Sequence, residues 1–331
     1  MKHTFSLLAF LALTALSLST YAAEARDVMG NWDGRWYGVE SSEGPVTAHI
    51  IAEGKGNFRA VISVDIGEVE PFPGEMRGKD QDAKVQFKGT VDLGPQNGGI
   101  YQLTGEVSDG KFTGRFSGLE NRGRFELKKL RKVSPTLGAK PPEGAIVLFD
   151  GKDYSKWVTT KDDKDVPNPW KPVGDAMEVR NGNIHTKQQF RDFKLHLEFR
   201  TPLEPTHRGQ GRGNSGVYLP GGNEIQVLDS FGLPPSHRDC GGFYGQAAPL
   251  VNACLPPEEW QTYDVTYIAP RFDKSGECIK NARVTVVHNG INIHDQFQPR
   301  RKPVREGGIL LQDHGNKVRY RNIWLVPMKD D

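Results

Sequence analysis

Residues 194–200 read Lys-Leu-His-Leu-Glu-Phe-Arg, and they alternate strictly between polar and apolar side chains. In an extended strand, Leu195, Leu197 and Phe199 would lie on one face and the polar side chains on the other. A period of two over seven residues is typical of a strand with one buried face. This stretch therefore predicts a β-fold for the part of the chain around it.

Further strand-like stretches follow toward the C-terminus. They are residues 213–219, 223–229, 260–267, 283–288, 291–294, 308–314 and 318–325. Asn289-Gly290 separates two of them and suits the positive backbone φ angles of a tight hairpin turn. Pro and Gly recur too often for a long helix. We therefore predict an all-β sandwich of two antiparallel sheets over residues 145–331.

The part before this sandwich alternates over shorter stretches. Short apolar–polar runs from Val28 to about Val133 are separated by glycines, and Asp109-Gly110 is a further hairpin signal. This pattern predicts a small antiparallel β-meander or barrel over residues 26–133. Three prolines and two glycines then mark residues 134–144 as a linker.

The first 25 residues have a different character. A lysine near the start precedes an apolar run from Phe5 to about Leu18, followed by small residues that suit a signal peptidase. This pattern predicts a cleaved signal peptide over residues 1–25 and a periplasmic or secreted protein. The run is shorter than the ~20 residues that span a bilayer, and no second long apolar segment follows. We therefore expect no integral membrane span.

The charge balance excludes one class of partner. The chain has 43 basic and 41 acidic side chains, which gives a formal net charge of +2. Nucleic-acid-binding proteins carry a concentrated basic surface. We expect no nucleic-acid partner.

The chain has three cysteines. Cys240 and Cys254 flank one Gly-rich loop, and an exported protein meets an oxidising compartment. We predict a disulfide between these two, which leaves Cys278 unpaired.

Three of the predicted strands carry unusual polar faces. Their outward positions hold amides, a phenol, an imidazole and one carboxylate, namely Asn214, Tyr218, Glu224, Gln226, Gln312 and His314. A solvated sheet face favours Lys, Thr, Arg and Glu instead. For any one strand, the alternative interpretation is an ordinary face exposed to solvent. As a set, these side chains suit a groove that hydrogen-bonds sugar hydroxyls.

Several short motifs resemble the 3-keto-disaccharide hydrolase family in order and spacing over about residues 145–327. They are Leu148-Phe-Asp-Gly-Lys152 with Trp157, Asn214-Ser-Gly-Val217, Glu224-Ile-Gln-Val-Leu-Asp229, Tyr244-Gly245, Trp260-Gln-Thr-Tyr263, His288-Asn-Gly290, Leu311-Gln-Asp-His-Gly315 and Arg321-Asn-Ile323. The resemblance implies a concanavalin-like jelly roll that hydrolyses 3-keto-glycosides. The residues before 134 lie outside it.

A keto group at C3 of a sugar makes the C2 proton acidic, so such a site needs one base, one acid and hydrogen-bond donors. Glu224 and His314 are the candidate catalytic pair, in either assignment. The candidate substrate-binding residues are Asn214, Tyr218, Gln226, Asp229, Tyr244 and Gln312. No cofactor is certain, but Glu224, Asp229 and His314 could hold a divalent metal ion. A sugar 3-dehydrogenase would supply the keto sugar.

Two other functions stay open. One is a non-catalytic, lectin-like carbohydrate-binding protein. The other is an ordinary endo-glycosidase that uses Glu224 and Asp229, because concanavalin-like glucanases carry a Glu-x-Asp-x-x-Glu strand. Here Gln226 replaces the middle acid and Asp229 shortens the last one. A retaining glycosidase needs two carboxyl groups about 5–5.5 Å apart, which makes this reading the less favourable one.

Overall fold

The computed structural model describes residues 25–67, 70–81, 84–119 and 121–329. The chain divides into two compact units, residues 1–132 and 133–331. The predicted signal peptide lies outside the described residues, except for Ala25. No helix in the described ranges is long and apolar enough to cross a membrane.

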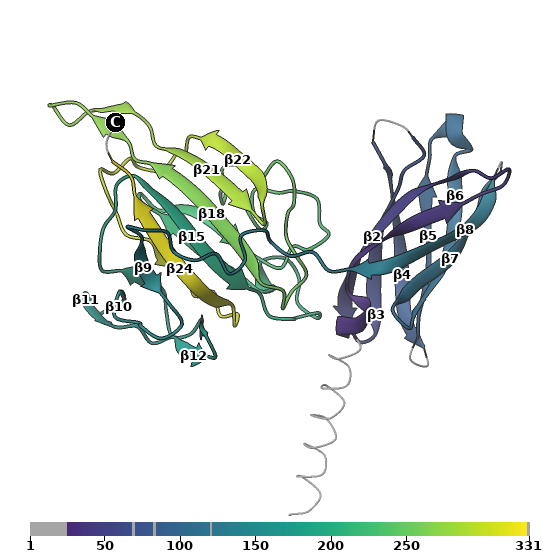
Figure 1. The fold of residues 1–331 in the computed structure, drawn as a ribbon, viewed down its shortest axis with the longest axis horizontal. Helices are drawn as coiled ribbons and strands as arrows, with labels where there is room; N and C mark the ends of the chain where they lie inside the picture. The colour runs from purple at the N-terminus through teal and green to yellow at the C-terminus, as the bar shows by residue number, and fades with distance from the viewer. Residues whose placement is uncertain (1–24, 68–69, 82–83, 120, 330–331) are drawn as a thin grey trace, which may run out of the picture. The chain divides into compact units, whose positions relative to one another are not determined.

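The first unit is a closed antiparallel barrel of eight strands (Figure 1). Its elements are β1 (Gly30–Tyr37), β2 (Glu43–Gly54), β3 (Asn57–Val64), β4 (Phe72–Gln81), β5 (Lys84–Asp92), η1 (Pro95–Asn97), β6 (Ile100–Ser108), β7 (Lys111–Ser117) and β8 (Arg122–Leu130). Pairing of β1 with β8 closes the ring and removes free strand edges. The sequence predicted an antiparallel meander or barrel here, and the structure shows the closed barrel.

The second unit contains two larger antiparallel sheets. Its elements are β9 (Ile146–Phe149), β10 (Trp157–Lys161), β11 (Lys164–Pro167), β12 (Lys171–Val173), β13 (Ala176–Glu178), β14 (Ile184–Thr186), β15 (Phe193–Arg200), η2 (Gly209–Gly211), β16 (Ser215–Leu219), β17 (Asn223–Val227), β18 (Gln261–Ile268), β19 (Arg271–Phe272), β20 (Cys278–Lys280), β21 (Arg283–His288), β22 (Ile291–Phe297), β23 (Leu310–Leu311) and β24 (Arg319–Pro327).

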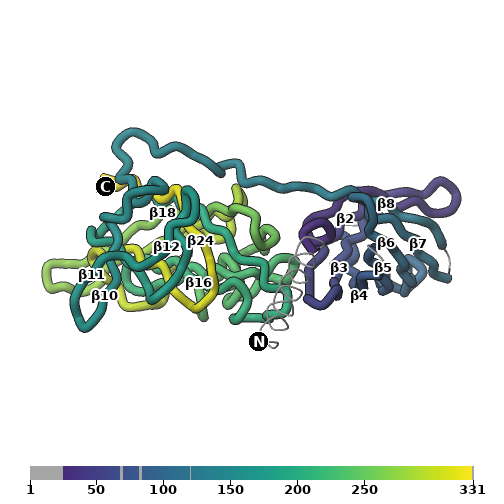
Figure 2. The backbone as a smooth tube through the Cα atoms, turned by 90° about the horizontal axis from the view of Figure 1, so that it is seen from below, coloured from purple at the N-terminus to yellow at the C-terminus, as the bar shows by residue number. Residues whose placement is uncertain are grey.

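The six-stranded sheet has the order β11-β10-β14-β23-β16-β17. The eight-stranded sheet has the order β12-β13-β24-β15-β18-β21-β22, with β9 paired to β24. Figure 1 shows β24, β15, β18, β21 and β22 side by side, and β10 and β11 are neighbours in Figures 1 and 2. Strands β19 and β20 form a separate pair.

The core lies where the two sheets contact each other. Leu195, Leu197 and Phe199, the apolar face of the alternating stretch in β15, are at most 2% exposed. Hydrogen bonds also join the sheets. The hydroxyl of Ser215 bonds the Tyr320 hydroxyl at 2.7 Å, the Tyr263 hydroxyl donates to the carbonyl of Gln226 at 2.6 Å, and the Trp157 indole donates to the carbonyl of Leu148 at 2.9 Å. The all-β prediction is confirmed.

The Asn-Gly hairpin is also as predicted. Asn289 and Gly290 connect β21 to β22 with φ angles of 51° and 81°. Both angles lie in the left-handed region that this dipeptide tolerates.

Candidate active site

A row of four side chains crosses the outer face of the six-stranded sheet. His185, Leu310, Tyr218 and Glu224 are successive register partners on β14, β23, β16 and β17. The alternate residues on these strands, among them Val217, Ile225 and Leu311, are fully buried in the core. Because side chains alternate along a strand, the row faces away from that core. It carries one carboxylate, at its β17 end.

Glu224 lies in a polar but largely dry setting. Its side chain hydrogen-bonds the Tyr218 hydroxyl, and the residue is only 7% exposed. Burial raises the pKa of the Glu224 carboxyl, and the Tyr218 hydrogen bond, His314 and Arg301 offset this only in part. A raised pKa brings a carboxyl closer to the range in which it can exchange protons at neutral pH.

Gly216 makes room for this carboxylate. It lies across from Gln226 on the neighbouring strand, and a β-carbon built there would overlap Oε1 of Glu224. The backbone of Gly216 has no positive φ that would demand glycine. We infer that glycine stands here for space.

Tyr218 and Gln312 form the polar surface beside the carboxylate. Nε2 of Gln312 donates to the Tyr218 hydroxyl at 3.1 Å. Burial and the nearby Glu224 charge both raise the pKa of the Tyr218 phenol, so it stays protonated. Two neutral groups that can donate hydrogen bonds therefore lie next to one ionisable carboxyl.

His314 lies in an exposed turn after β23 and acts electrostatically on Glu224. Asp313 fixes this turn, since its carboxylate accepts hydrogen bonds from the backbone N–H of Gly182 at 2.7 Å and of Gly315 at 2.8 Å. The carbonyl of Glu224 accepts a hydrogen bond from the backbone N–H of Tyr244 at 3.0 Å. Five predicted residues are thus together: Tyr218, Glu224, Tyr244, Gln312 and His314.

Asp229 is not part of this cluster. Its Oδ2 accepts a hydrogen bond from Nε of Arg212 at 2.6 Å, and the two side chains are 1% and 7% exposed. Asp229 follows the end of β17, and its backbone N–H bonds the carbonyl of Arg212. This carboxylate pairs with a buried arginine, and its burial does not suit direct contact with a substrate.

Gln226 and Asn214 are covered by loops. Nε2 of Gln226 donates to Oε1 of Gln210 at 2.9 Å, and Nδ2 of Asn214 donates to the carbonyl of Gln210 at 2.7 Å. The segment around Phe243 forms a bridge to Ile225 and lies along the free edge of β17. Both amides are at most 1% exposed and hold the loops that flank the cluster.

A family model described as the 3-keto-α-glucoside-1,2-lyase-like domain matches residues 144–326. The chain belongs to this family. The resemblance found in the sequence motifs is thereby confirmed, and the family domain coincides with the second unit. A comparison with curated proteins gave no match.

Three solved structures resemble the family domain. All are candidate glycosyl hydrolases from Parabacteroides distasonis ATCC 8503, and each match covers 56% of this chain. The first has 36% identity and a TM-score of 0.50 over 85% of its own chain. The second and third have 19% and 21% identity, over 95% and 99% of theirs, with TM-scores of 0.43 and 0.41.

The family domain also contains an arginine that the sequence did not single out. Arg301 acts on both Glu224 and Tyr218 through its charge. It lies in the loop after β22, whose Lys302 carbonyl lies close to Gly221 of the β16–β17 turn. The basic run Arg300-Arg301-Lys302 was visible in the sequence. Its position near Glu224 could not be predicted, because it depends on a contact between segments about 80 residues apart.

The three predicted metal ligands of the family domain do not come together. Among the described residues, no group of three or more His, Cys, Asp or Glu side chains could hold a metal ion. Asp229 is engaged by Arg212, which leaves Glu224 and His314. The donor set does not fit a divalent ion, so we derive no step through one.

The predicted Cys240–Cys254 disulfide is not formed in this structure, where Cys240, Cys254 and Cys278 are free thiols. The buried Cys240 and Cys254 thiols hydrogen-bond each other. Cys254 Sγ also bonds the carbonyl of Leu255 at 3.3 Å. The pair is adjacent, and the covalent bond stays a prediction.

Proposed function

We propose that this protein hydrolyses 3-keto-glycosides by elimination and hydration at the Glu224 cluster. Family membership over residues 144–326 supports the reaction class. The observation that carries the proposal is the largely buried Glu224 carboxyl with raised pKa, beside the Tyr218 hydroxyl, on the outer face of the six-stranded sheet.

The reaction proceeds in two steps. A base takes the C2 proton, the C2–H electron pair forms an enolate with the C3 ketone, and the C1–O bond breaks to give an unsaturated ketone and an alcohol. Water then adds at C1, and a proton returns to C2. The sum is hydrolysis, and no outside oxidant or reductant is needed.

We assign Glu224 as the base and His314 as the acid. A largely desolvated carboxylate is a stronger base than one in water, because burial favours its protonated form. His314 is exposed beside the cluster, so its imidazole is accessible to the departing oxygen as the proton donor. Tyr218 and Gln312 supply donors for the enolate oxygen or for sugar hydroxyls.

The Arg212–Asp229 pair argues against an ordinary endo-glycosidase. Retaining hydrolysis needs a second carboxyl group that reaches the substrate. Asp229 is buried and bound to Arg212 at 2.6 Å, so it cannot supply that group without breaking a buried ion pair. Elimination at C1 uses one base and does not require a second carboxyl group.

We also propose the finer parts of this assignment. The two sheets would form a concanavalin-like jelly roll. The protein would act after export to the periplasm or outside the cell, on keto sugars made by a sugar 3-dehydrogenase.

The test compares a 3-keto-glucoside with its unoxidised parent. We expect product release from the keto form alone, and loss of release in Glu224→Gln. Cleavage of the parent alone would overturn the proposal in favour of a two-carboxylate glycosidase. Sugar binding without cleavage of either compound would support the lectin-like alternative.

A further inference from the structure

The two ends of the N-terminal barrel differ. At one end, tight turns join β2 to β3 and β6 to β7, and the Trp32 indole donates to the carbonyl of Val28 at 2.9 Å. Trp32, Phe87 and Phe112 fill this end, with ring centroids 5.2–6.2 Å apart. All three side chains are at most 1% exposed. This end of the barrel is closed by packed aromatic side chains.

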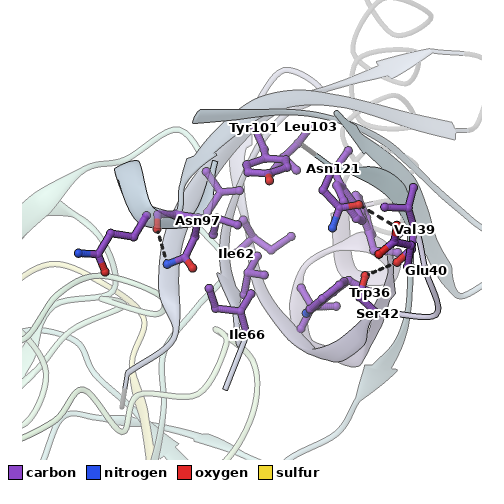
Figure 3. A pocket seen from close by; sticks show the side chains of 17 residues that line it. Trp36, Val39, Glu40, Ser42, Ile62, Ile66, Asn97, Tyr101, Leu103 and Asn121 are labelled. Atoms are coloured by element: carbon purple, nitrogen blue, oxygen red, sulfur yellow. Dashed lines mark hydrogen bonds between the residues drawn. The ribbon is translucent and has the colours of Figure 1, made fainter. Parts of the chain in front are cut away.

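The other end holds a cavity of about 540 Å³ (Figure 3). Its walls are mostly aliphatic and aromatic, including Ile62, Leu103 and Tyr101, and Phe125 also lines it. An eight-stranded barrel has an interior of the right size for side chains or for one small ligand. Apolar pockets of 300–1,000 Å³ typically hold drug-sized molecules.

Aromatic rings form part of the cavity wall, and two of these rings are not fully covered. Trp36 and Phe116 make an edge-to-face contact at 6.1 Å, as do Phe116 and Tyr101. Trp36 and Phe116 are only half-buried, in contrast to the aromatic side chains at the closed end. The Trp36 indole donates to the carbonyl of Asp65 at 2.7 Å, which fixes its ring. A rigid, partly exposed aromatic wall favours a ring-containing ligand.

The mouth of the cavity is polar and ordered. Oδ1 of Asn121 accepts hydrogen bonds from the backbone N–H of Val39 at 3.1 Å and of Arg122 at 2.8 Å. Nδ2 of Asn97 donates to the carbonyl of Leu93 at 3.1 Å. The Asn121 side chain, just before β8, thus joins the connection between β1 and β2 at the opening.

The charge at the mouth narrows the ligand class. Among the described lining residues, the one charged side chain is Glu40, a carboxylate. The Glu40 carboxylate would repel an anionic headgroup, and the described lining contains no lysine or arginine to bind one. Amide and hydroxyl groups at the mouth suit a hydroxyl or carbonyl group instead.

We propose that the barrel binds one neutral, ring-containing apolar molecule of drug size, with its polar end at the mouth. This binding function is separate from the proposed hydrolysis and does not depend on it. It lies in a part of the chain that the family match does not cover.

The test uses the full chain and the neutral fluorescent probe N-phenyl-1-naphthylamine. We expect saturable binding, which Leu103→Trp weakens at least tenfold by filling the cavity. Thr104→Trp is the matched control, because Thr104 is the next residue of β6 and faces outward. We expect it to bind like the wild type.

Further arms keep the proposal falsifiable. Phe116→Ala removes part of the aromatic wall without filling the cavity, and we expect weaker binding even if Leu103→Trp misfolds by circular dichroism. 1-Naphthol should displace the probe, and 1-naphthalenesulfonate should do so at least tenfold less well. No binding by the wild type, or equal binding by Leu103→Trp and Thr104→Trp when both fold, would overturn the proposal.

Discussion

At the residue scale, Glu224 combines burial with a position on an outward sheet face. The residue is 7% exposed, yet no buried cation neutralises it as Arg212 neutralises Asp229 among the described residues. Two carboxylates five residues apart thus have different settings. The first is suited to proton transfer and the second to holding a loop.

Glu224→Gln tests the first role. The amide keeps the shape of the side chain but cannot take a proton, so we expect kcat on a 3-keto-glucoside to fall by about 10²–10⁴. KM should change little, because Tyr218 and Gln312 remain. A kcat within a factor of a few of the wild type would rule out Glu224 as the base.

Gly216→Ala tests the space beneath the carboxylate. The new β-carbon would overlap Oε1 of Glu224 and push the carboxyl away, so we expect kcat to fall by about a hundredfold. Gly211→Ala is the control, because a β-carbon there meets nothing within 4 Å and its φ is ordinary. Equal activity of both variants would contradict the proposed packing.

Asp229→Asn tests the second role. The substitution removes the carboxylate of a buried ion pair with Arg212, and breaking such a pair costs about 3–5 kcal/mol in the free energy of unfolding. Asp175→Asn is the comparison, since Asp175 pairs with Arg321 while 68% exposed, and a change within about 1 kcal/mol is expected. Urea unfolding measures both. A stable Asp229→Asn with lost turnover would instead place Asp229 in the chemistry.

The sequence predicted some of these residues better than others. Strand alternation placed Tyr218 and Glu224 on the outward face, because that property is local. The covering of Gln226 and Asn214 depends on Gln210, a residue from a loop without regular pattern. Such contacts form only when the whole domain folds.

At the element scale, the outer face of β15 is covered by residues 134–139. The sequence predicts this segment as part of a linker and the polar face of β15 as its outward side. In the structure, the N–H of Gly138 donates to Oε1 of Glu198 at 2.6 Å, and Thr136 donates to Asp264 at 2.7 Å. Nδ1 of His196 lies 2.6 Å from the other Asp264 oxygen. The alternation of β15 was correct, but it could not reveal this cover.

The charges under this cover make the stability of the second unit depend on pH. Burial opposes ionisation of Glu198, but hydrogen bonds from His196, Asn322, Gly138 and Arg321 outweigh it and lower its pKa from 4.5 to about 2. Stability from a depressed carboxyl pKa is present above the unfolded value and is lost as the pH falls. We expect a loss of about 3 kcal/mol between pH 4.5 and pH 2.

Glu198→Gln should remove this acid dependence in urea unfolding, whereas the exposed Glu277→Gln should retain it. His196 adds the opposite trend. Burial lowers its pKa, but Asp264 and Glu198 raise it above 6.5 overall. The stability that His196 contributes is therefore fully present below pH 6.5 and is lost as the pH rises through its pKa in the folded state. If Glu198→Gln lost the same stability between pH 4.5 and pH 2 as the wild type, the assignment of this loss to Glu198 would be refuted.

At the scale of the whole molecule, the two units carry separate candidate sites. The family match covers the second unit, and the barrel lies outside it. The sequence predicted an antiparallel meander or barrel from alternation and turns. Closure requires β1 to pair with β8, nearly 100 residues away, and the cavity depends on which interior side chains leave space. Neither follows from a local pattern.

The two proposed sites should therefore be separable by mutation. Leu103→Trp should lose binding of N-phenyl-1-naphthylamine and keep turnover of a 3-keto-glucoside, and Glu224→Gln should do the reverse. Parallel assays on the same full-length preparations measure both. Loss of both properties in one folded variant would mean that the sites are not independent.

Hydrolysis of a 3-keto-glucoside in D₂O tests the central claim most directly. Elimination removes the C2 proton and hydration returns one from solvent, so the account predicts about one deuterium at C2 of the product per bond cleaved, from the first time points. The free keto sugar incubated with the wild-type protein in D₂O is the control for exchange after cleavage. Product that keeps its C2 proton would contradict elimination, and with it the role assigned to Glu224.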